Sequence, residues 1–299
     1  MSLFNKLVVW FLPLIPKPIV GLVSKRYVAG AELKDAIRVV KELNSRGMLA
    51  TMDVLGESTK DPGECDAAVQ EYFEVLEEID KEKLNCNISI KPTQLGLLID
   101  KEICYKNIKK IVEKAATFNN FVRIDMEDSS CTSDTIEIYL RLQQEHQNVG
   151  IVIQSYLRRS HKDVQELVKL RTNFRICKGI YVEPREIAYK DPQIITDNFA
   201  LLLETALKAR CYVGIATHDE KVVWHGLRIV KQLGLNTEEY EFQMLLGVDE
   251  QLRQILVDEG HKLRVYVPFG RQWYPYCVRR LKENPKIAFY VLKAMVGLR

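Results

Sequence analysis

Two adjacent arginines near the end of the chain are the first residues whose types and spacing suggest chemistry. Arg279 and Arg280 lie in WYPYCVRRLKENP, and helical spacing places them on one face with Glu283. Two guanidinium groups can bind a small carboxylate or phosphate through paired hydrogen bonds, and Glu283 could hold one of them in place. An Arg-Arg pair on a helix is more often a solvated surface, and we expect that role for the pair at 158–159. The aromatic residues around the later pair favour binding.

Charged and polar residues alternate with apolar ones along several β-rich segments. In FVRIDMED, the apolar residues at 122, 124 and 126 share one face, which suits packing under helices, and the charged residues at 123, 125 and 127 share the other. Five further segments alternate in the same way. Their outward residues include Ile88, Ile90, Ile151, Ile153, Phe174 and Ile176. Their inward residues are Ser89, Lys91, Val152, Gln154, Arg175, Cys177, Glu241, Gln243, Arg264 and Tyr266.

Eight β-rich segments alternate with helical patterns from about residue 31 onward. They begin near residues 48, 87, 121, 149, 174, 212, 240 and 262. Apolar residues recur at helical spacing over 31–45 and again after Pro62. Eight strands separated by single helices require parallel crossovers, and eight parallel strands close into a (β/α)8 barrel of the TIM type. An open doubly wound α/β sheet is the alternative, but the chain has neither a GxGxxG motif nor a P-loop.

The inward residues of this barrel are too polar for an ordinary core. Buried charge is costly unless it is paired, so these groups must contact one another or a polar ligand. A salt-bridge lattice that braces the barrel accounts for some of them, with Arg123 and Glu127 as candidates. Polar residues nevertheless reach the carboxyl ends of six strands, where the active sites of such barrels lie. We therefore expect a ligand-filled mouth.

The composition excludes several classes of protein. Of the 299 residues 47% are hydrophobic, and 43 Lys and Arg against 40 Asp and Glu leave a net charge of +3. Disorder is therefore excluded, and no nucleic-acid partner is expected. The seven cysteines form no CxxC pair and the five histidines form no HExxH pair. We expect reduced thiols, a cytoplasmic location and no protein-bound metal.

An apolar arm precedes the barrel. We assign residues 1–30 to this helical arm and residues 31–299 to one catalytic barrel domain. The segment LVVWFLPLI at 7–15 lacks the cleavage site of a secretory signal, and prolines interrupt it well short of a membrane-spanning length. We expect the arm to pack on the barrel. Peripheral contact with the inner face of the membrane is the alternative.

Eight sequence blocks together resemble the proline dehydrogenase family. They are DVLGE (53–57), IKPTQLG (90–96), RIDMED (123–128), QSYLRR (154–159), RICKGIY (175–181), ATH (216–218), EFQMLLG (241–247) and YVPFG…WYPYCVRRLKENP (266–285). The resemblance implies an FAD-binding (β/α)8 barrel that oxidises L-proline to Δ1-pyrroline-5-carboxylate, the first step of proline catabolism, and passes electrons to membrane quinone. A separate pyrroline-5-carboxylate dehydrogenase would then receive the product.

The resemblance also implies roles for individual residues. Arg279 and Arg280 match the family's carboxylate-binding pair, with Glu283 as their partner. The residues that match the lining of the proline pocket are Lys91, Asp125, Tyr266 and Tyr276. The residues that fall in the flavin-binding segments are Gln154, Arg175, Lys178, Gly179, Tyr181, Thr217, His218 and Gln243. FAD would supply the redox chemistry, while these side chains supply binding and orientation.

Three finer expectations concern charge at this site. Lys91 and Asp125 are expected to pair and to set each other's charge. The Arg175 guanidinium is expected to stabilise the anionic reduced flavin. His218 is expected to hydrogen-bond the flavin or the backbone rather than to act as a general base.

The chain departs from the family pattern at a few positions. Asp219 and Cys177 stand where family members often carry Asn and Val. Pro92 directly follows Lys91 and is expected to shift the end of that strand.

Three other functions stay open from the sequence. A hydroxyproline dehydrogenase of the same family is the closest alternative. A lyase or aldolase would use the same barrel with Lys91 or Lys178 as a Schiff-base amine. A barrel that only binds a partner would have a sealed apolar mouth, which the charged inward residues disfavour.

Overall fold

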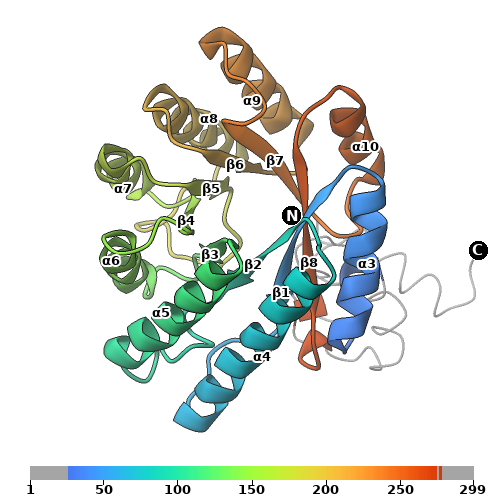
Figure 1. The fold of residues 1–299 in the computed structure, drawn as a ribbon. Coiled ribbons are helices and arrows are strands. Elements are labelled where there is room, and N and C mark those ends of the chain that lie inside the picture. Colours follow the sequence, from blue (N-terminus) through green and yellow to red (C-terminus); the bar gives the residue numbers. More distant parts are fainter. Residues whose placement is uncertain (1–25, 275, 278–299) are drawn as a thin grey trace, which may run out of the picture.

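Eight parallel strands form a closed barrel in chain order (Figure 1). The computed structural model describes residues 26–274, 276 and 277. The strands are β1 Leu49–Val54, β2 Cys86–Ile90, β3 Val122–Ile124, β4 Val149–Gln154, β5 Phe174–Cys177, β6 Val213–Ala216, β7 Tyr240–Leu245 and β8 Leu263–Phe269. Strand β1 pairs with both β2 and β8, which closes the barrel. The predicted (β/α)8 barrel is confirmed, and the open sheet is excluded.

Helices surround the strands on the outside (Figure 1). They are α3 Leu33–Ser45, α4 Pro62–Lys81, α5 Lys101–Thr117, α6 Thr132–Gln143, α7 Ser160–Leu167, α8 Pro192–Lys208, α9 Glu220–Leu233 and α10 Glu250–Asp258, with the short 3-10 helix η2 Val168–Leu170. Asp61 and Asp191 cap α4 and α8 by accepting two backbone N–H bonds each. A proline follows each cap, where its fixed φ suits the first helical residue and its missing N–H costs nothing.

The outward faces of the strands form the apolar core beneath the helices. All the residues predicted to point outward from β2, β4 and β5 are buried in this core: Ile88, Ile90, Ile151, Ile153, Phe174 and Ile176. Complete burial of each such side chain contributes about 1.5–3 kcal/mol. This layer fixes the strand positions and therefore leaves the inward faces free for polar residues.

Two glycines make room for large polar side chains inside the barrel. A Cβ at Gly150 on β4 would lie 2.4 Å from Nη1 of Arg123, and one at Gly214 on β6 would lie 2.3 Å from Nε2 of Gln243. Glycine within a strand commonly marks such a close approach. The barrel interior is thus filled by long polar side chains that lie across glycine positions rather than by layers of Val, Ile and Leu.

The end of the predicted arm contacts the barrel. Arg26 donates from Nε to the carbonyl oxygen of Gly247 at 2.8 Å, and the N–H of Ala29 donates to the carbonyl of Pro268 at 2.9 Å. The rest of the arm, residues 1–25, lies outside the described residues. No helix in the described part of the chain is long and apolar enough to cross a membrane.

Candidate active site

A cavity of about 400 Å³ lies where the strands end at the carboxyl side of the barrel. Twelve of the fifteen predicted site residues line it: Lys91, Asp125, Gln154, Arg175, Lys178, Gly179, Tyr181, Thr217, His218, Gln243, Tyr266 and Tyr276. The other three, Arg279, Arg280 and Glu283, lie outside the described residues, and their roles stay predictions. Side chains that are up to 185 residues apart in the chain therefore share one cavity, because they lie on the barrel strands or in the segments that follow them.

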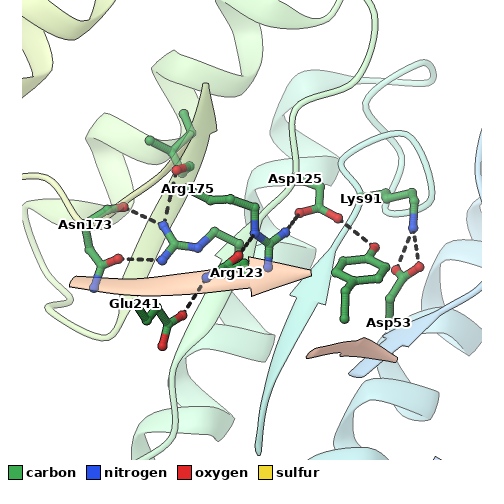
Figure 2. Close-up of polar contacts among 10 residues, drawn as sticks. Asp53, Lys91, Arg123, Asp125, Asn173, Arg175 and Glu241 are labelled. Carbon is green, nitrogen blue, oxygen red and sulfur yellow. Dashed lines mark hydrogen bonds and ion pairs between the residues drawn. The ribbon is translucent and has the colours of Figure 1, made fainter. Parts of the chain in front are cut away.

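Asp125 is held from two sides at the floor of the cavity. Nη1 of Arg175 lies 2.5 Å from one carboxylate oxygen, and the Tyr266 hydroxyl donates to the other at 2.9 Å (Figure 2). The Arg175 guanidinium also lies over the Tyr266 ring, 5.3 Å from its centroid. Burial and the neighbouring Asp125 and Asp53 carboxylates raise the pKa of Tyr266, so the phenol keeps its proton and remains a donor.

Lys91 pairs with Asp53 and not with Asp125 (Figure 2). Its Nζ lies 2.6 and 2.7 Å from the two Asp53 oxygens, and the side chains are 8% and 0% exposed. The expected Lys91–Asp125 pair is therefore wrong. The reason lies in the strand register, because Asp53 on β1 stands beside Ser89 on β2, two residues before Lys91, which directly follows this strand. Arg175 and Tyr266 already occupy the two oxygens of Asp125.

The charge of Lys91 follows from these neighbours. Burial lowers the pKa of Lys91, but attraction to Asp53 and Asp125 outweighs burial, and the pKa lies above its usual value. A protonated amine is not a nucleophile, so this pairing disfavours the Schiff-base alternative for Lys91. Sequence analysis missed Asp53 as a site residue. The alternation in LATMDV could have identified it. Met52 is buried on the outward face of the strand, beneath the helices, so its neighbour Asp53 must point inward.

A chain of hydrogen bonds continues from Arg175 into the barrel. Nε of Arg175 donates to Gln243 at 2.5 Å, and the Gln243 amide donates to Glu241 at 2.5 Å. Arg264 binds both oxygens of Glu241, at 2.7 and 3.0 Å. Burial alone would raise the pKa of Glu241, but the Arg264 charge and hydrogen bonds outweigh it, and the pKa is lowered. The orientation of Arg175 is thus fixed by three residues behind it.

The two residues proposed for a bracing lattice brace the barrel through hydrogen bonds to uncharged groups. Arg123 donates to the backbone and side-chain oxygens of Asn173 at 2.6 and 2.5 Å (Figure 2). Glu127 accepts from the N–H and hydroxyl of Thr93 at 2.8 and 2.6 Å. Met126 was expected under the helices but also lines the cavity, because β3 ends at Ile124 and its alternation ends there.

His218 and Asp219 follow the end of β6. Nε2 of His218 accepts a hydrogen bond from the N–H of Leu245 at 2.8 Å, which places the histidine in the backbone role that we expected as one of two possibilities. This bond assigns the ring proton to Nδ1. Asp219 accepts from the N–H of Lys221 at 2.9 Å, and its other oxygen lies 2.5 Å from Nζ of Lys178.

The loop after β5 carries Lys178 and Gly179 and is tied to its neighbour. Gly179 has a φ of +98°, and a Cβ there would lie 2.2 Å from the Tyr156 ring. Arg158 donates from Nε to the carbonyl of Arg185 at 2.8 Å, with its guanidinium 4.5 Å from the centroid of the Tyr189 ring. The expectation of a merely solvated Arg158 is therefore incomplete, since this side chain braces the loop.

No group of three His, Cys, Asp or Glu side chains that could hold a metal ion occurs within residues 26–274, 276 and 277. Pro92 turns the chain directly after Lys91, and its carbonyl accepts from the N–H groups of Leu95 and Leu97 at 3.0 Å each. Strand β2 accordingly ends at Ile90.

Comparisons with known proteins point to one family. Residues 36–290 match the model of a family described as proline dehydrogenase. Proline dehydrogenase 1 of Bacillus subtilis (strain 168) is 34% identical over 91% of this chain and 90% of its own length. The proline dehydrogenase of Deinococcus radiodurans is 35% identical over 91% of this chain and 90% of its own.

Larger proteins contain a similar barrel. The crystal structure of proline utilization A from Bdellovibrio bacteriovorus, inactivated by N-propargylglycine, superposes with a TM-score of 0.82 at 27% identity and covers 87% of this chain. This chain spans 32% of that protein and 24% of the bifunctional protein PutA of Escherichia coli (strain K12), to which it is 25% identical over 91% of its own length.

Proposed function

Because the chain belongs to the proline dehydrogenase family, oxidoreductases that act on a CH–NH bond, we propose that it oxidises L-proline to Δ1-pyrroline-5-carboxylate with bound FAD and passes the electrons to a membrane quinone. One observation carries this proposal. Twelve residues that match the family's substrate and flavin segments line a single cavity at the carboxyl ends of the strands.

The donor set of the cavity fits FAD. Gln154, Arg175 and Gln243 end or lie near the ends of strands in the cavity and present the amide and guanidinium groups that suit the polar edge of a flavin ring. Lys178 lies nearer to solvent, where a cation suits phosphate. The lack of a side chain at Gly179 lets the loop lie against Tyr156. FAD, when bound, accepts the two electrons that proline loses.

The remaining residues would bind and orient proline. Arg279 and Arg280 would hold its carboxylate, with Glu283 positioning one guanidinium, as the family resemblance implies. Tyr266 and Tyr276 would contact the ring from the cavity wall. The hydrogen bond to Asp125 fixes the Tyr266 phenol in place, so its position does not have to be set during substrate binding.

Asp125 also weakens the electrostatic effect that Arg175 would have on a bound flavin. The guanidinium is already balanced by a carboxylate at 2.5 Å, so its electrostatic effect on a reduced flavin would be that of an ion pair rather than that of a bare cation. Oxidised flavin would therefore be favoured more than the sequence alone suggested. The alternative hydroxyproline dehydrogenase is disfavoured by Tyr266, whose phenol would crowd an added ring hydroxyl.

We propose a cytoplasmic location for the protein, with peripheral contact at the inner face of the membrane that carries the quinone. The product would pass to a separate pyrroline-5-carboxylate dehydrogenase. The bifunctional PutA relatives, of which this chain spans about a quarter, support a partner of this kind.

A dye-linked assay with product trapping tests the proposal. The full chain is reconstituted with FAD, supplied with L-proline and a soluble dye, and the product is captured with o-aminobenzaldehyde, which forms a coloured adduct with the pyrroline. We expect dye reduction and adduct in equal amounts. Dye reduction by 4-hydroxyproline but not by proline, or cleavage of a carbon–carbon bond without dye reduction, would replace the proposal by one of the alternatives.

A further inference from the structure

Each cation that lines the cavity within the described residues has a carboxylate partner, but the three pairs differ in exposure. Lys91 with Asp53 and Arg175 with Asp125 are buried, with side chains at most 13% exposed. Lys178 and Asp219 are 32% and 37% exposed, and they come from the loops after β5 and β6. This third pair is the one that an entering anion can reach.

Asp219 contacts two hydrogen-bond donors of a kind that also bind phosphate. One oxygen lies 2.5 Å from Nζ of Lys178, and the other accepts the N–H of Lys221 at the start of α9. The N-terminal N–H groups of a helix and a nearby lysine together favour an anion. Burial would raise the pKa of Asp219, but the bonds from Lys178 and Lys221 outweigh it and lower the pKa, so the carboxylate stays charged at neutral pH.

We propose that Asp219 is a built-in competitor for the phosphates of the cofactor. Its carboxylate holds Lys178 and the first turn of α9, so a phosphate must displace it from Lys178 and then bind beside a negative charge. Asp219 would thereby weaken the binding of phosphate-bearing flavins without affecting the recognition of the flavin ring. This inference rests on the proposed function, because it takes Lys178 as a phosphate ligand of FAD.

Asp219→Asn tests the competition. The Asn oxygen can still accept from Lys221, since Asn and Asp are equally good caps, while the charge that holds Lys178 is lost. Removing one unit charge a few ångströms from a partly exposed phosphate changes affinity by about five- to tenfold. We therefore expect FAD to bind about five- to tenfold more tightly to the variant, as measured by quenching of flavin fluorescence on the full chain.

Riboflavin and a matched variant provide the controls. Riboflavin carries the same ring without phosphate, so its Kd should be the same for both proteins. Asp134→Asn removes a carboxylate from another partly exposed ion pair, with Lys101 on α5, in which the side chains are 47% and 35% exposed, and should leave the Kd of FAD unchanged. Lys178→Met should weaken FAD binding and abolish the effect of Asp219→Asn in the double variant.

Equal Kd values of FAD for the wild type and Asp219→Asn, or an equal gain for riboflavin, would overturn the inference while leaving the proposed function intact. Failure of FAD to bind to either folded protein would overturn both. Tighter FAD binding that persists in the Lys178→Met background would also overturn it, because the effect would not pass through Lys178.

Discussion

Ion pairs inside the barrel and ion pairs between the outer helices use the same side chains in opposite surroundings. Lys91–Asp53 inside is at most 8% exposed, whereas Lys101–Glu137, between α5 and α6, is 35% and 51% exposed, with an N–O distance of 2.7 Å. The two N–O distances are nearly equal, but the two pairs contribute differently to the free energy of folding. Water screens the outer pair, while the inner pair has exchanged its hydration for its partner.

The difference shows what the inner pairs are for. Replacing a buried pair by apolar residues is often neutral or stabilising, so stability alone does not explain charges in a barrel core. The inner pairs here lie in or directly behind the cavity and hold Arg175, Tyr266 and Lys91 through hydrogen bonds to buried or nearly buried partners. The outer pairs hold long side chains on the helix surface. We therefore infer that the inner charges serve the site.

Asp53→Asn should have the largest effect on stability. It leaves the buried Lys91 ammonium without its carboxylate, and breaking a buried pair from one side costs about 3–5 kcal/mol. We expect this loss in the free energy of unfolding from denaturant titration. Adding Lys91→Met should restore most of it, because no unpaired charge remains. A double variant that is as unstable as the single one would show that Asp53 acts by packing alone.

Tyr266→Ser should have the next largest effect, a change in substrate preference. The phenol lies in the cavity wall, and removing it opens space for a ring hydroxyl. We expect kcat/KM for proline to fall. We also expect the ratio of kcat/KM for 4-hydroxyproline to kcat/KM for proline to rise, by an amount that corresponds to about 1–3 kcal/mol. Tyr266→Phe keeps the ring and should keep the preference for proline. An unchanged ratio in the Ser variant would remove Tyr266 from substrate selection.

The lowered pKa of Glu241 predicts that the stability of the barrel decreases in acid. Its pKa is lowered in the folded state, so its stabilising effect is complete above the usual value of about 4.3 and is lost as pH falls through the lower folded value. The free energy of unfolding should decrease below about pH 4.5. Glu241→Gln should be less stable at neutral pH, with a difference from the wild type that shrinks in acid. A constant difference at every pH would contradict the lowered pKa.

Lys101→Met should have the smallest effect and sharpens the contrast. Its ammonium contacts Glu137 and Asp134 on the surface, where an ion pair contributes little. We expect no measurable change in Tm and no change in kcat/KM for proline. A drop in Tm comparable to that of Asp53→Asn would remove the distinction between inner and outer pairs.

The alternation of apolar and polar residues predicted the strands and six of the cavity residues, because successive strand residues point to opposite faces. The other six, Lys178, Gly179, Tyr181, Thr217, His218 and Tyr276, were predicted from the family resemblance. Ile88 and Ile90 are in the core, and Lys91, after the strand end, faces the cavity, as expected. Alternation does not predict which of two inward carboxylates pairs with a lysine. That depends on register between strands, which placed Asp53 beside Ser89 and gave Lys91 a different partner from the one expected.

Alternation also fails where a strand stops. Strand β3 has only three residues and ends at Ile124. Met126, two positions further, lines the cavity, although continued alternation would place it on the outward face with Val122 and Ile124. The loop contacts of Arg158 could not be predicted either, because the carbonyl that it binds belongs to a loop 27 residues further along the chain. Local patterns thus predict faces, whereas partners depend on tertiary contacts.

The most direct test of the central claim is an absorbance spectrum of the full chain reconstituted with FAD, recorded anaerobically before and after addition of L-proline. If the polar cavity is a flavin site that oxidises proline, the flavin band should bleach near neutral pH and return on admission of a soluble dye. A folded, FAD-loaded preparation whose band does not change with L-proline would contradict it.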